Sequence, residues 1–256
     1  MRNNKSVEQH LTRRGWALPL VWGALLLVGV LGMPYMEGVF RWMEADARQV
    51  IYNRAEFYTL LARHLLVVGV AALVTISVGV LAGIAVTRQR GRDFLPLVGQ
   101  LASLGQTFPP VAVLALAVPV LGFGTLPIIV ALMLYGLLPI VRNTLVGLQD
   151  VNADIKQAAL AMGMTPWQIL RRVELPLAAP VILAGVRTSV TINIATAALG
   201  ATVGASNLGD PIIAGIVNGN MAYVLQGALL IALLALTVDS AFDVYQQRLR
   251  TRLSAS

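Results

Sequence analysis

Six long apolar runs constrain this chain more than any other feature of its sequence. A helix needs about 20 mostly apolar residues to cross the hydrocarbon core of a bilayer. Because the bilayer core offers no water, a helix is favoured there, since it satisfies its own backbone groups. The sequence therefore predicts an all-α membrane protein with about six transmembrane helices. The runs are 18–36, 65–86, 101–121, 126–141, 178–203 and 224–245.

The composition agrees with a membrane protein. The chain is 57% hydrophobic and only 12% charged, whereas soluble domains carry about 25% charged residues. The 23 glycines and 12 prolines do not argue against transmembrane helices, because neighbouring helices can satisfy the backbone groups that they free. The absence of cysteine excludes a disulfide framework, a thiolate metal site and a cysteine nucleophile.

The net charge of +7 does not indicate nucleic-acid binding. Basic residues gather beside the apolar runs, which is how membrane topology is set, and no nucleic-acid-binding motif is present. Six spans with a cytoplasmic N-terminus predict both termini in the cytoplasm, with most basic residues on that side. The cytoplasmic set is Arg2, Lys5, Arg13, Arg14, Arg88, Arg90, Arg92, Arg142, Lys156, Arg171, Arg172, Arg248, Arg250 and Arg252, and the other side holds Arg41, Arg48, Arg54 and Arg63.

The first run follows basic residues, so a secretory signal peptide is an alternative to a membrane anchor. We expect an uncleaved anchor, because the run is longer than a typical signal core and no small-x-small cleavage site follows it. Residues 37–63 form the most polar stretch. This stretch predicts an extracytoplasmic loop that includes a helix lying at the interface.

The third run is interrupted in its middle by Gln106, Thr107, Phe108, Pro109 and Pro110. Proline removes a helix donor and displaces the carbonyl of the preceding turn, so we expect a kink or an unwound segment. Two interpretations stay open. The kink lines a translocation path, or it is an irregularity of packing. Gly122, Phe123 and Gly124 then predict a short turn before the fourth run.

The longest amphipathic passage lies at residues 142–176, between the fourth and fifth runs, and we expect it to stay outside the membrane until Pro176 begins the next helix. Val151 to Arg172 predict a helix, a turn and a second short helix. Asn152 or Asp154 can cap the first helix, Gly163 can end it in a left-handed conformation, and Thr165 can cap the second, with Pro166 at its first position.

We call residues 151–172 the knob. Its predicted tip consists of Ala158, Ala159, Ala161 and Gly163. Such small side chains let another backbone approach closely, so the knob suits a socket on a partner protein. The alternative is that it packs against the underside of its own helix bundle.

The fifth run carries an unusual polar load, including Arg187, Ser189, Thr191 and Asn193. A charge at this depth costs roughly 2.5 to 3.5 kcal/mol, so Arg187 needs a partner or water. Asp239, and less so Asp243, are the available acids, either for a structural pair or for gating. The residues 204–222 predict a glycine-rich loop. The candidate pathway or gating residues are Gln106, Pro109, Pro110, Arg187, Asn193 and Asp239.

Motifs of enzymes and of ATP binding are missing from the sequence. His10 and His64 lack metal-ligand spacing, no Ser-His-Asp arrangement is present, and no Gly-x-x-x-x-Gly-Lys-Ser/Thr phosphate loop occurs. We therefore expect no catalytic residue, no metal and no cofactor in this chain. If transport is driven by ATP, another chain hydrolyses it.

The knob resembles the conserved cytoplasmic loop of bacterial ABC importer permeases. In that family Glu-Ala-Ala is followed, four residues after the second alanine, by glycine, and later by Ile-x-Leu-Pro. Here Gln157, Ala158, Ala159, Gly163, Leu175 and Pro176 keep this spacing, with Gln157 in place of the family's glutamate. Residues 105–110, 167–189, 192–197 and 203–213 extend the resemblance to permeases that import glycine betaine, choline, carnitine or proline, so that it covers about 61–245.

The resemblance implies a type I ABC importer permease fold in the bacterial inner membrane. Its partners would be a cytoplasmic ABC ATPase, which binds ATP and Mg, a second permease and a periplasmic substrate-binding protein. The coupling helix would contact the ATPase through Gln157, Ala158, Ala159, Gly163, Thr165 and Pro166. The domains would be 1–60 (N-terminal segment, first span and periplasmic loop), 61–246 (transmembrane domain, with the coupling loop 142–176) and 247–256 (cytoplasmic basic tail).

A rival hypothesis is a self-sufficient secondary transporter or channel. In that case Arg187 and Asp239 would form an ion-coupling site. An internal inverted repeat is typical of such transporters, and none is evident in the sequence. Uptake without ATP by this chain alone would favour the rival.

Overall fold

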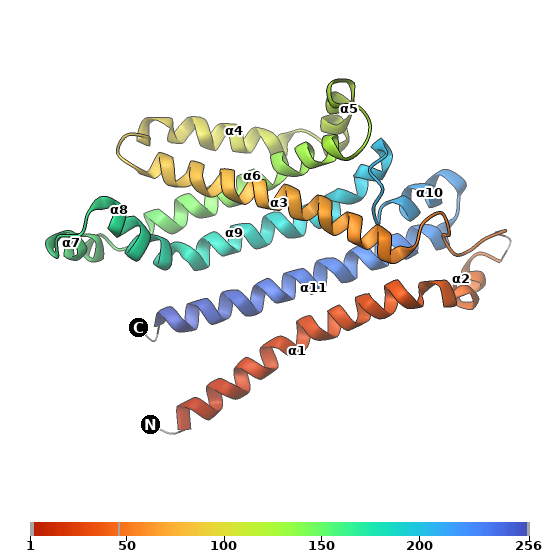
Figure 1. Cartoon of the computed structure of the whole chain (residues 1–256), viewed down its shortest axis with the longest axis horizontal. Coiled ribbons are helices and arrows are strands. Elements are labelled where there is room, and N and C mark those ends of the chain that lie inside the picture. Colours follow the sequence, from red (N-terminus) through yellow and green to blue (C-terminus); the bar gives the residue numbers. More distant parts are fainter. Residues whose placement is uncertain (1–2, 46, 255–256) are drawn as a thin grey trace. The chain divides into compact units, whose positions relative to one another are not determined.

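The computed structural model describes residues 3–45 and 47–254, with side chains described from residue 15 onward apart from those of 46, 252 and 254. The described residues form helices that are joined by turns and by an irregular segment at 44–56, and they contain no strand. The prediction of an all-α protein is therefore confirmed (Figure 1). The helices are α1 (Asn3–Gly32), α2 (Glu37–Met43), α3 (Phe57–Thr87), α4 (Leu95–Thr107), α5 (Pro110–Leu121), α6 (Thr125–Gln149), α7 (Ala153–Ala161), α8 (Pro166–Ile169), α9 (Leu175–Thr196), α10 (Asp210–Asn218) and α11 (Met221–Ser254).

Shorter helical turns connect several of these helices. Three are 3-10 helices, at Met33–Tyr35, Arg92–Phe94 and Ala197–Val203, and Leu170–Glu174 is a π-helix. The predicted loop at 204–222 is wrong in part, because α10 lies within it. Pro211 stands near the start of α10, where the fixed φ angle of proline suits the first turn of a helix. The glycines around it favour a loop, so the local composition does not indicate this helix.

Five helical stretches of the described chain are long and apolar enough to cross a membrane, or six if α4 and α5 count as one bent span. This agrees with the predicted number. Of the charged residues that set the expected orientation, Arg2 lies outside the described residues, as do the side chains of Lys5, Arg13, Arg14 and Arg252.

The predicted break in the third run is confirmed. Phe108 and Pro109 are extended, with ψ angles of 137° and 140°, between the end of α4 and the start of α5. A residue that precedes proline is pushed out of the helical region by the proline ring. Phe108 and Pro109 both precede a proline, and Pro110 then occupies the first turn of α5, where its missing donor costs little.

The described residues form two compact units. Unit 1 comprises Met1–Ala71, Pro109–Leu132 and Thr191–Val244, and unit 2 comprises Ala72–Phe108, Met133–Val190 and Tyr245–Ser256. The boundaries at 60 and 246 stay predictions.

Unit 1 fixes the polar stretch before α3 against the start of α11. The side chain of Gln226 accepts a hydrogen bond from the Tyr52 N–H at 3.0 Å and donates one to the Val50 carbonyl at 2.6 Å. Asn220 donates to the Gln49 carbonyl at 2.8 Å. These contacts join residues more than 170 positions apart, so an irregular segment becomes a defined surface.

Unit 2 brings its helices together at glycines. A Cβ at Gly185 of α9 would lie 2.6 Å from the Pro139 carbonyl oxygen of α6, and a Cβ at Gly105 of α4 would lie 2.5 Å from the Leu134 carbonyl oxygen. Only glycine permits these approaches. Below the knob, Leu148, Leu170 and Ala178 form a buried apolar cluster, with Ile84, Leu175 and Ile182 against it. This cluster is the base on which the knob stands.

Candidate functional site

Helix α7 of the knob begins where the sequence predicts. Asn152 is the N-cap, and its side-chain oxygen accepts a hydrogen bond from the Asp154 N–H at 2.8 Å. Such a cap satisfies one of the donors that have no partner within the helix. This local contact therefore fixes the residue at which α7 begins.

The end of α7 confirms the role of Gly163. This glycine has a φ of +80°, and the two carbonyls of the last turn, those of Ala159 and Leu160, accept from Met164 N at 3.1 Å and Gly163 N at 2.9 Å. This pair of bonds is a Schellman motif, which turns the chain sharply out of a helix. The sharp turn brings α8 next to α7 (Figure 1).

Helix α8 begins with a complete capping box. Thr165 Oγ1 accepts from the Gln168 N–H at 3.3 Å, and the Gln168 side chain accepts from the Thr165 N–H at 2.8 Å. Pro166 occupies the first turn, as predicted. Local hydrogen bonds at the helix ends therefore fix where α7 ends and where α8 begins.

The prediction that Pro176 begins a separate helix is wrong, whereas the placement of 142–176 outside the membrane stays a prediction. Helix α8 continues through the π-helix Leu170–Glu174 into α9, and α6 extends beyond Arg142 to Gln149. In the π-helix the Leu175 N–H bonds to the Leu170 carbonyl, five residues earlier. The wider turn stands directly before Pro176, which has no donor of its own.

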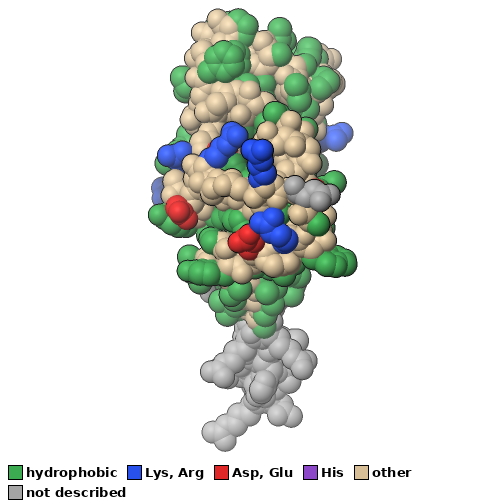
Figure 2. All heavy atoms as spheres, turned by 90° about the vertical axis from the view of Figure 1, so that its right-hand side faces the viewer, with side chains coloured by type: hydrophobic (Ala, Val, Ile, Leu, Met, Phe, Trp, Pro, Cys, Tyr) green, Lys and Arg blue, Asp and Glu red, His purple; other side chains and the backbone are tan. Residues whose placement is uncertain are grey.

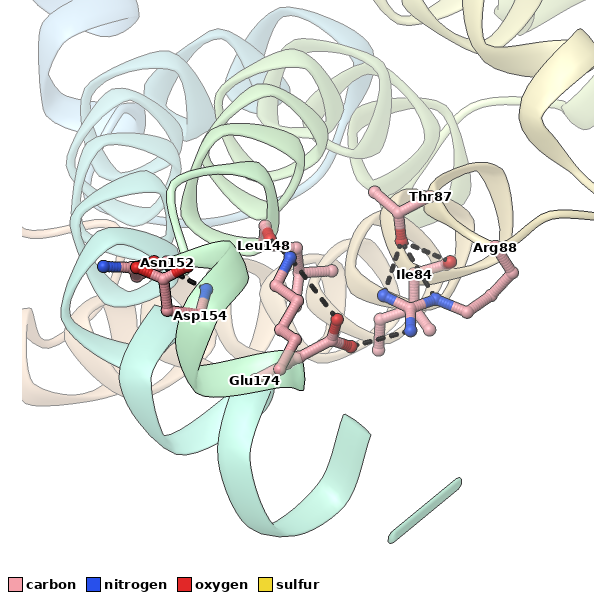
Figure 3. Close-up of polar contacts among 8 residues, drawn as sticks. Ile84, Thr87, Arg88, Leu148, Asn152, Asp154 and Glu174 are labelled. Carbon is pink, nitrogen blue, oxygen red and sulfur yellow. Dashed lines mark hydrogen bonds and ion pairs between the residues drawn. The ribbon is translucent and has the colours of Figure 1, made fainter. Parts of the chain in front are cut away.

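A buried acid links the knob to the end of α3. Glu174 is only 7% exposed, and its Oε2 lies 2.7 Å from Nη1 of Arg88. Its Oε1 lies 3.6 Å from Nζ of Lys156 in α7, and Lys156 also donates to the Leu148 carbonyl. Figure 3 shows Glu174 pointing toward Arg88, whose guanidinium also reaches the Thr87 hydroxyl. We call Glu174, Arg88 and Lys156 the ion-pair cluster.

The sequence pattern does not predict this cluster. Arg88 and Lys156 enter the sequence analysis only as charges that set the topology, and Glu174 lies 86 residues from Arg88. The hint in the sequence is that Glu174 is a single acid between the basic pair at 171–172 and the Leu-Pro pair at 175–176. Glu174 is the shared member of this cluster, so removing it leaves both cations without their counter-charge.

The outer surface of the knob is more apolar than predicted. Ala159 is 2% exposed and packs inward, whereas Leu160, Met162 and Trp167 are 55%, 76% and 65% exposed. The predicted tip is therefore wrong for Ala159 and omits three large side chains. Helical periodicity explains the difference, since α7 packs against α8 and the π-helix and only one of its faces is covered. Of the six proposed coupling residues, Gln157, Ala158, Gly163, Thr165 and Pro166 are exposed.

Of the candidates around the break in the third run, Gln106 contacts α6, whereas Pro109 and Pro110 belong to unit 1. The Gln106 side chain donates to the Tyr135 carbonyl at 2.8 Å, and the Tyr135 hydroxyl donates to the Phe108 carbonyl. A groove of about 660 Å³ runs between α4 and α6, and its polar lining includes Gln100, Ser103, Thr107 and Arg142. Of these, only Thr107 lies in the segment that the sequence indicates as a possible pathway lining, although 100, 103 and 107 share a helix face.

The remaining pathway candidates lie in different units. Arg187 belongs to unit 2, whereas Asn193 and Asp239 belong to unit 1. Asn193 is fully buried, and neither of its side-chain amide atoms has a hydrogen-bond partner. The pairing of Arg187 with Asp239 stays a prediction. Among the residues that the structure describes, no group of three or more His, Cys, Asp or Glu side chains could hold a metal ion.

Comparison with known proteins gives a consistent picture. The family described as "Binding-protein-dependent transport system inner membrane component" matches residues 76–251. The osmoprotectant import permease protein OsmY of Salmonella typhimurium is 44% identical over 187 residues, 73% of this chain and 79% of that protein. The choline transport system permease protein OpuBB of Bacillus subtilis is 34% identical over 84% of this chain and 94% of that protein.

A solved structure shares the fold. A chain of the inward-facing MetNI methionine ABC transporter matches with a TM-score of 0.66 at 22% identity, covering 75% of this chain and 95% of that chain.

Proposed function

Because the chain belongs to the binding-protein-dependent transport system inner membrane components and is a permease subunit of an ABC importer for osmoprotectants, we propose that it couples to its ATPase through the knob. The chain is a multi-pass inner membrane protein and not itself an enzyme. The finer proposal names glycine betaine as a cargo, a separate ATPase that binds ATP and Mg, a periplasmic binding protein and a second permease.

The exposed apolar surface of the knob is the observation that carries the coupling proposal. Leu160, Met162 and Trp167 project from two short helices whose ends are locked by caps and whose base is fixed by the ion-pair cluster. Large apolar side chains gathered on a rigid surface favour a protein partner. The ATPase is the partner that an importer without a phosphate loop requires.

The knob can pass movement of the ATPase to the transmembrane helices. It continues through α8 and the π-helix into α9, and Glu174 connects it to Arg88 at the end of α3. A displacement of the knob would therefore reach two membrane helices through covalent and ionic connections. This movement would open the transport path to one side of the membrane at a time. The residues that line the groove between α4 and α6 would form part of the wall of that path.

Gln157 is exposed and replaces the glutamate that the family often carries. A carboxylate there would pair with a basic residue at the rim of the ATPase socket, and an exposed pair contributes only about 0 to 1 kcal/mol. The apolar contacts would then supply most of the affinity. The proposed orientation has both termini, and hence the knob, on the cytoplasmic side.

Reconstitution tests the proposal. The chain would be purified with its proposed ATPase, second permease and binding protein, and ATP-driven uptake of radiolabelled glycine betaine would be measured in liposomes. Trp167→Ala and Met162→Ala should weaken co-purification of the ATPase and reduce uptake, whereas Leu20→Ala, at a position 68% exposed on α1, should change neither. Normal assembly and uptake in both knob variants would contradict coupling through this surface. Uptake by this chain alone without ATP would instead favour a secondary transporter.

A further inference from the structure

A second candidate site lies in unit 1, whereas the knob belongs to unit 2. A pocket of about 360 Å³ is bordered by the segment before α3, the 3-10 helix Ala197–Val203 and α10. Its polar side chains include Tyr52, Arg54, Ser206 and Asp210, and Ile213 and Val217 add apolar surface. Figure 2 faces the end of unit 1 that carries α2 and α10, and both basic and acidic side chains lie there among hydrophobic ones.

The acidic side of the pocket is held in place before any ligand arrives. The Ser206 hydroxyl donates to Oδ2 of Asp210 at 2.6 Å, and the Asn207 N–H donates to Oδ1 at 3.3 Å. Each carboxylate oxygen keeps a free lone pair, because an ionised carboxylate can accept about four hydrogen bonds. Asp210 therefore presents a negative charge in a fixed position.

The aromatic side of the pocket is equally fixed. The Tyr52 N–H bonds to Gln226, and the Tyr52 ring meets the Tyr223 ring edge-on, with centroids 5.7 Å apart and an interplanar angle of 86°. Burial and the nearby Asp210 charge raise the pKa of Tyr52, while Arg54 lowers it. Tyr52 thus stays a neutral phenol at physiological pH.

We propose that this pocket receives a small zwitterion, with its trimethylammonium group against Asp210 and Tyr52 and its carboxylate against Arg54. The chemistry fits because aromatic rings and carboxylates attract quaternary ammonium groups, and guanidinium binds carboxylate in two parallel hydrogen bonds. The choice of ligand rests on the proposed function. In the proposed orientation the pocket opens on the extracytoplasmic side, where the solute arrives.

Binding to the detergent-solubilised assembly of permease and ATPase, without the binding protein, tests the assignment. Equilibrium dialysis would compare radiolabelled glycine betaine, which has both charges, with choline, which lacks the carboxylate. Arg54→Gln should weaken betaine binding about tenfold and leave choline unchanged, since one charge-assisted contact is lost. Asp210→Asn should weaken both, and its amide oxygen can still accept from Ser206.

Arg48→Gln is the matched control, because Arg48 is an exposed arginine of the same segment that does not line the pocket. It should leave both ligands unchanged. If Asp210→Asn does not assemble, Arg54→Gln and Tyr52→Leu carry the test. Absence of saturable betaine binding to the wild-type assembly, or equal losses in Arg54→Gln and Arg48→Gln, would overturn the site.

Uptake in liposomes with the binding protein separates this inference from the proposed function. An assembly that transports betaine but does not bind it here contradicts the pocket alone. An assembly that binds betaine with the expected variant pattern but transports no trimethylammonium solute supports the pocket and contradicts the proposed cargo.

Discussion

Replacing Glu174 by glutamine tests whether the ion-pair cluster holds the knob to the transmembrane helices. The substitution keeps the size of the side chain and removes its charge. Arg88 Nη1, at 2.7 Å, and Lys156 Nζ, at 3.6 Å, would then face a neutral amide. Both cations lose their counter-charge in a single step.

The size of the effect follows from the burial of the three side chains. Breaking a fully buried pair costs about 3 to 5 kcal/mol, and an exposed pair is worth about 0 to 1 kcal/mol. Glu174 is 7% exposed, but Arg88 and Lys156 are 34% and 29% exposed, so each can turn partly toward water. We expect a loss of about 1 to 3 kcal/mol, between those limits.

The assays are thermal unfolding of the purified assembly and the amount of solute transported per ATP hydrolysed. One kcal/mol corresponds to about 2 to 4 °C for chains of roughly this length, so the midpoint should fall by several degrees. Transport per ATP should also fall, because the knob would move without α3. Asp150→Asn is the control, since Asp150 is an exposed acid of the same loop.

A double-mutant cycle supplies the decisive comparison. If Arg88 and Glu174 act together, combining Arg88→Gln with Glu174→Gln should cost little more than Glu174→Gln alone. Additive losses, or a Glu174→Gln midpoint equal to that of Asp150→Asn, would refute the reasoning.

Four further positions are tested, three of them in the knob and one, Gly185, where α9 meets α6. Gly163→Ala should weaken assembly with the ATPase, because a non-glycine residue in the left-handed region costs roughly 1 to 2 kcal/mol, and Gly163→Asn should be milder; equal co-purification of the ATPase with wild type and Gly163→Ala would contradict this. Thr165→Ala should lower the thermal midpoint through loss of the capping box, which is worth about 1 kcal/mol, whereas an unchanged midpoint would show that the cap is dispensable. Gly185→Ala places a Cβ 2.6 Å from the Pro139 carbonyl and should destabilise by about 1 to 3 kcal/mol; Gly99→Ala, where no atom lies within 4 Å, is its control in the same unfolding assay. Gln157→Glu should change the affinity for the ATPase by no more than about 1 kcal/mol and only at low salt, so a large salt-independent change in titration calorimetry would contradict a rim contact.

The caps of the knob show how far local sequence can be interpreted. Gly163 and Thr165 have the roles that the sequence predicts, and Asn152 is one of the two caps that it offers for α7, because a cap depends on the conformation and side chain of one or two neighbouring residues. The break at Phe108 and Pro109 was predictable for the same reason. No knowledge of the fold was needed for either.

Other features depend on how helices rotate and meet. The inward position of Ala159, the exposure of Trp167 and the contacts of Gln106 follow from which face of each helix meets the bundle. The local pattern predicts a helix start at Pro176, whereas the π-helix before it keeps the chain helical from α8 into α9. A rule based on neighbouring residues cannot represent that adjustment.

The sequence by itself determined the membrane class, the number of spans and the caps, since hydropathy and backbone preference act within short windows. Only the tertiary structure decided that Glu174 meets Arg88 and that Asp210 shares a pocket with Tyr52 and Arg54. Residues so far apart become neighbours through helix packing, and the free energy of their contact depends on burial that no local pattern specifies. The order of residues determines where each charge lies along the chain, whereas the fold determines which group that charge contacts.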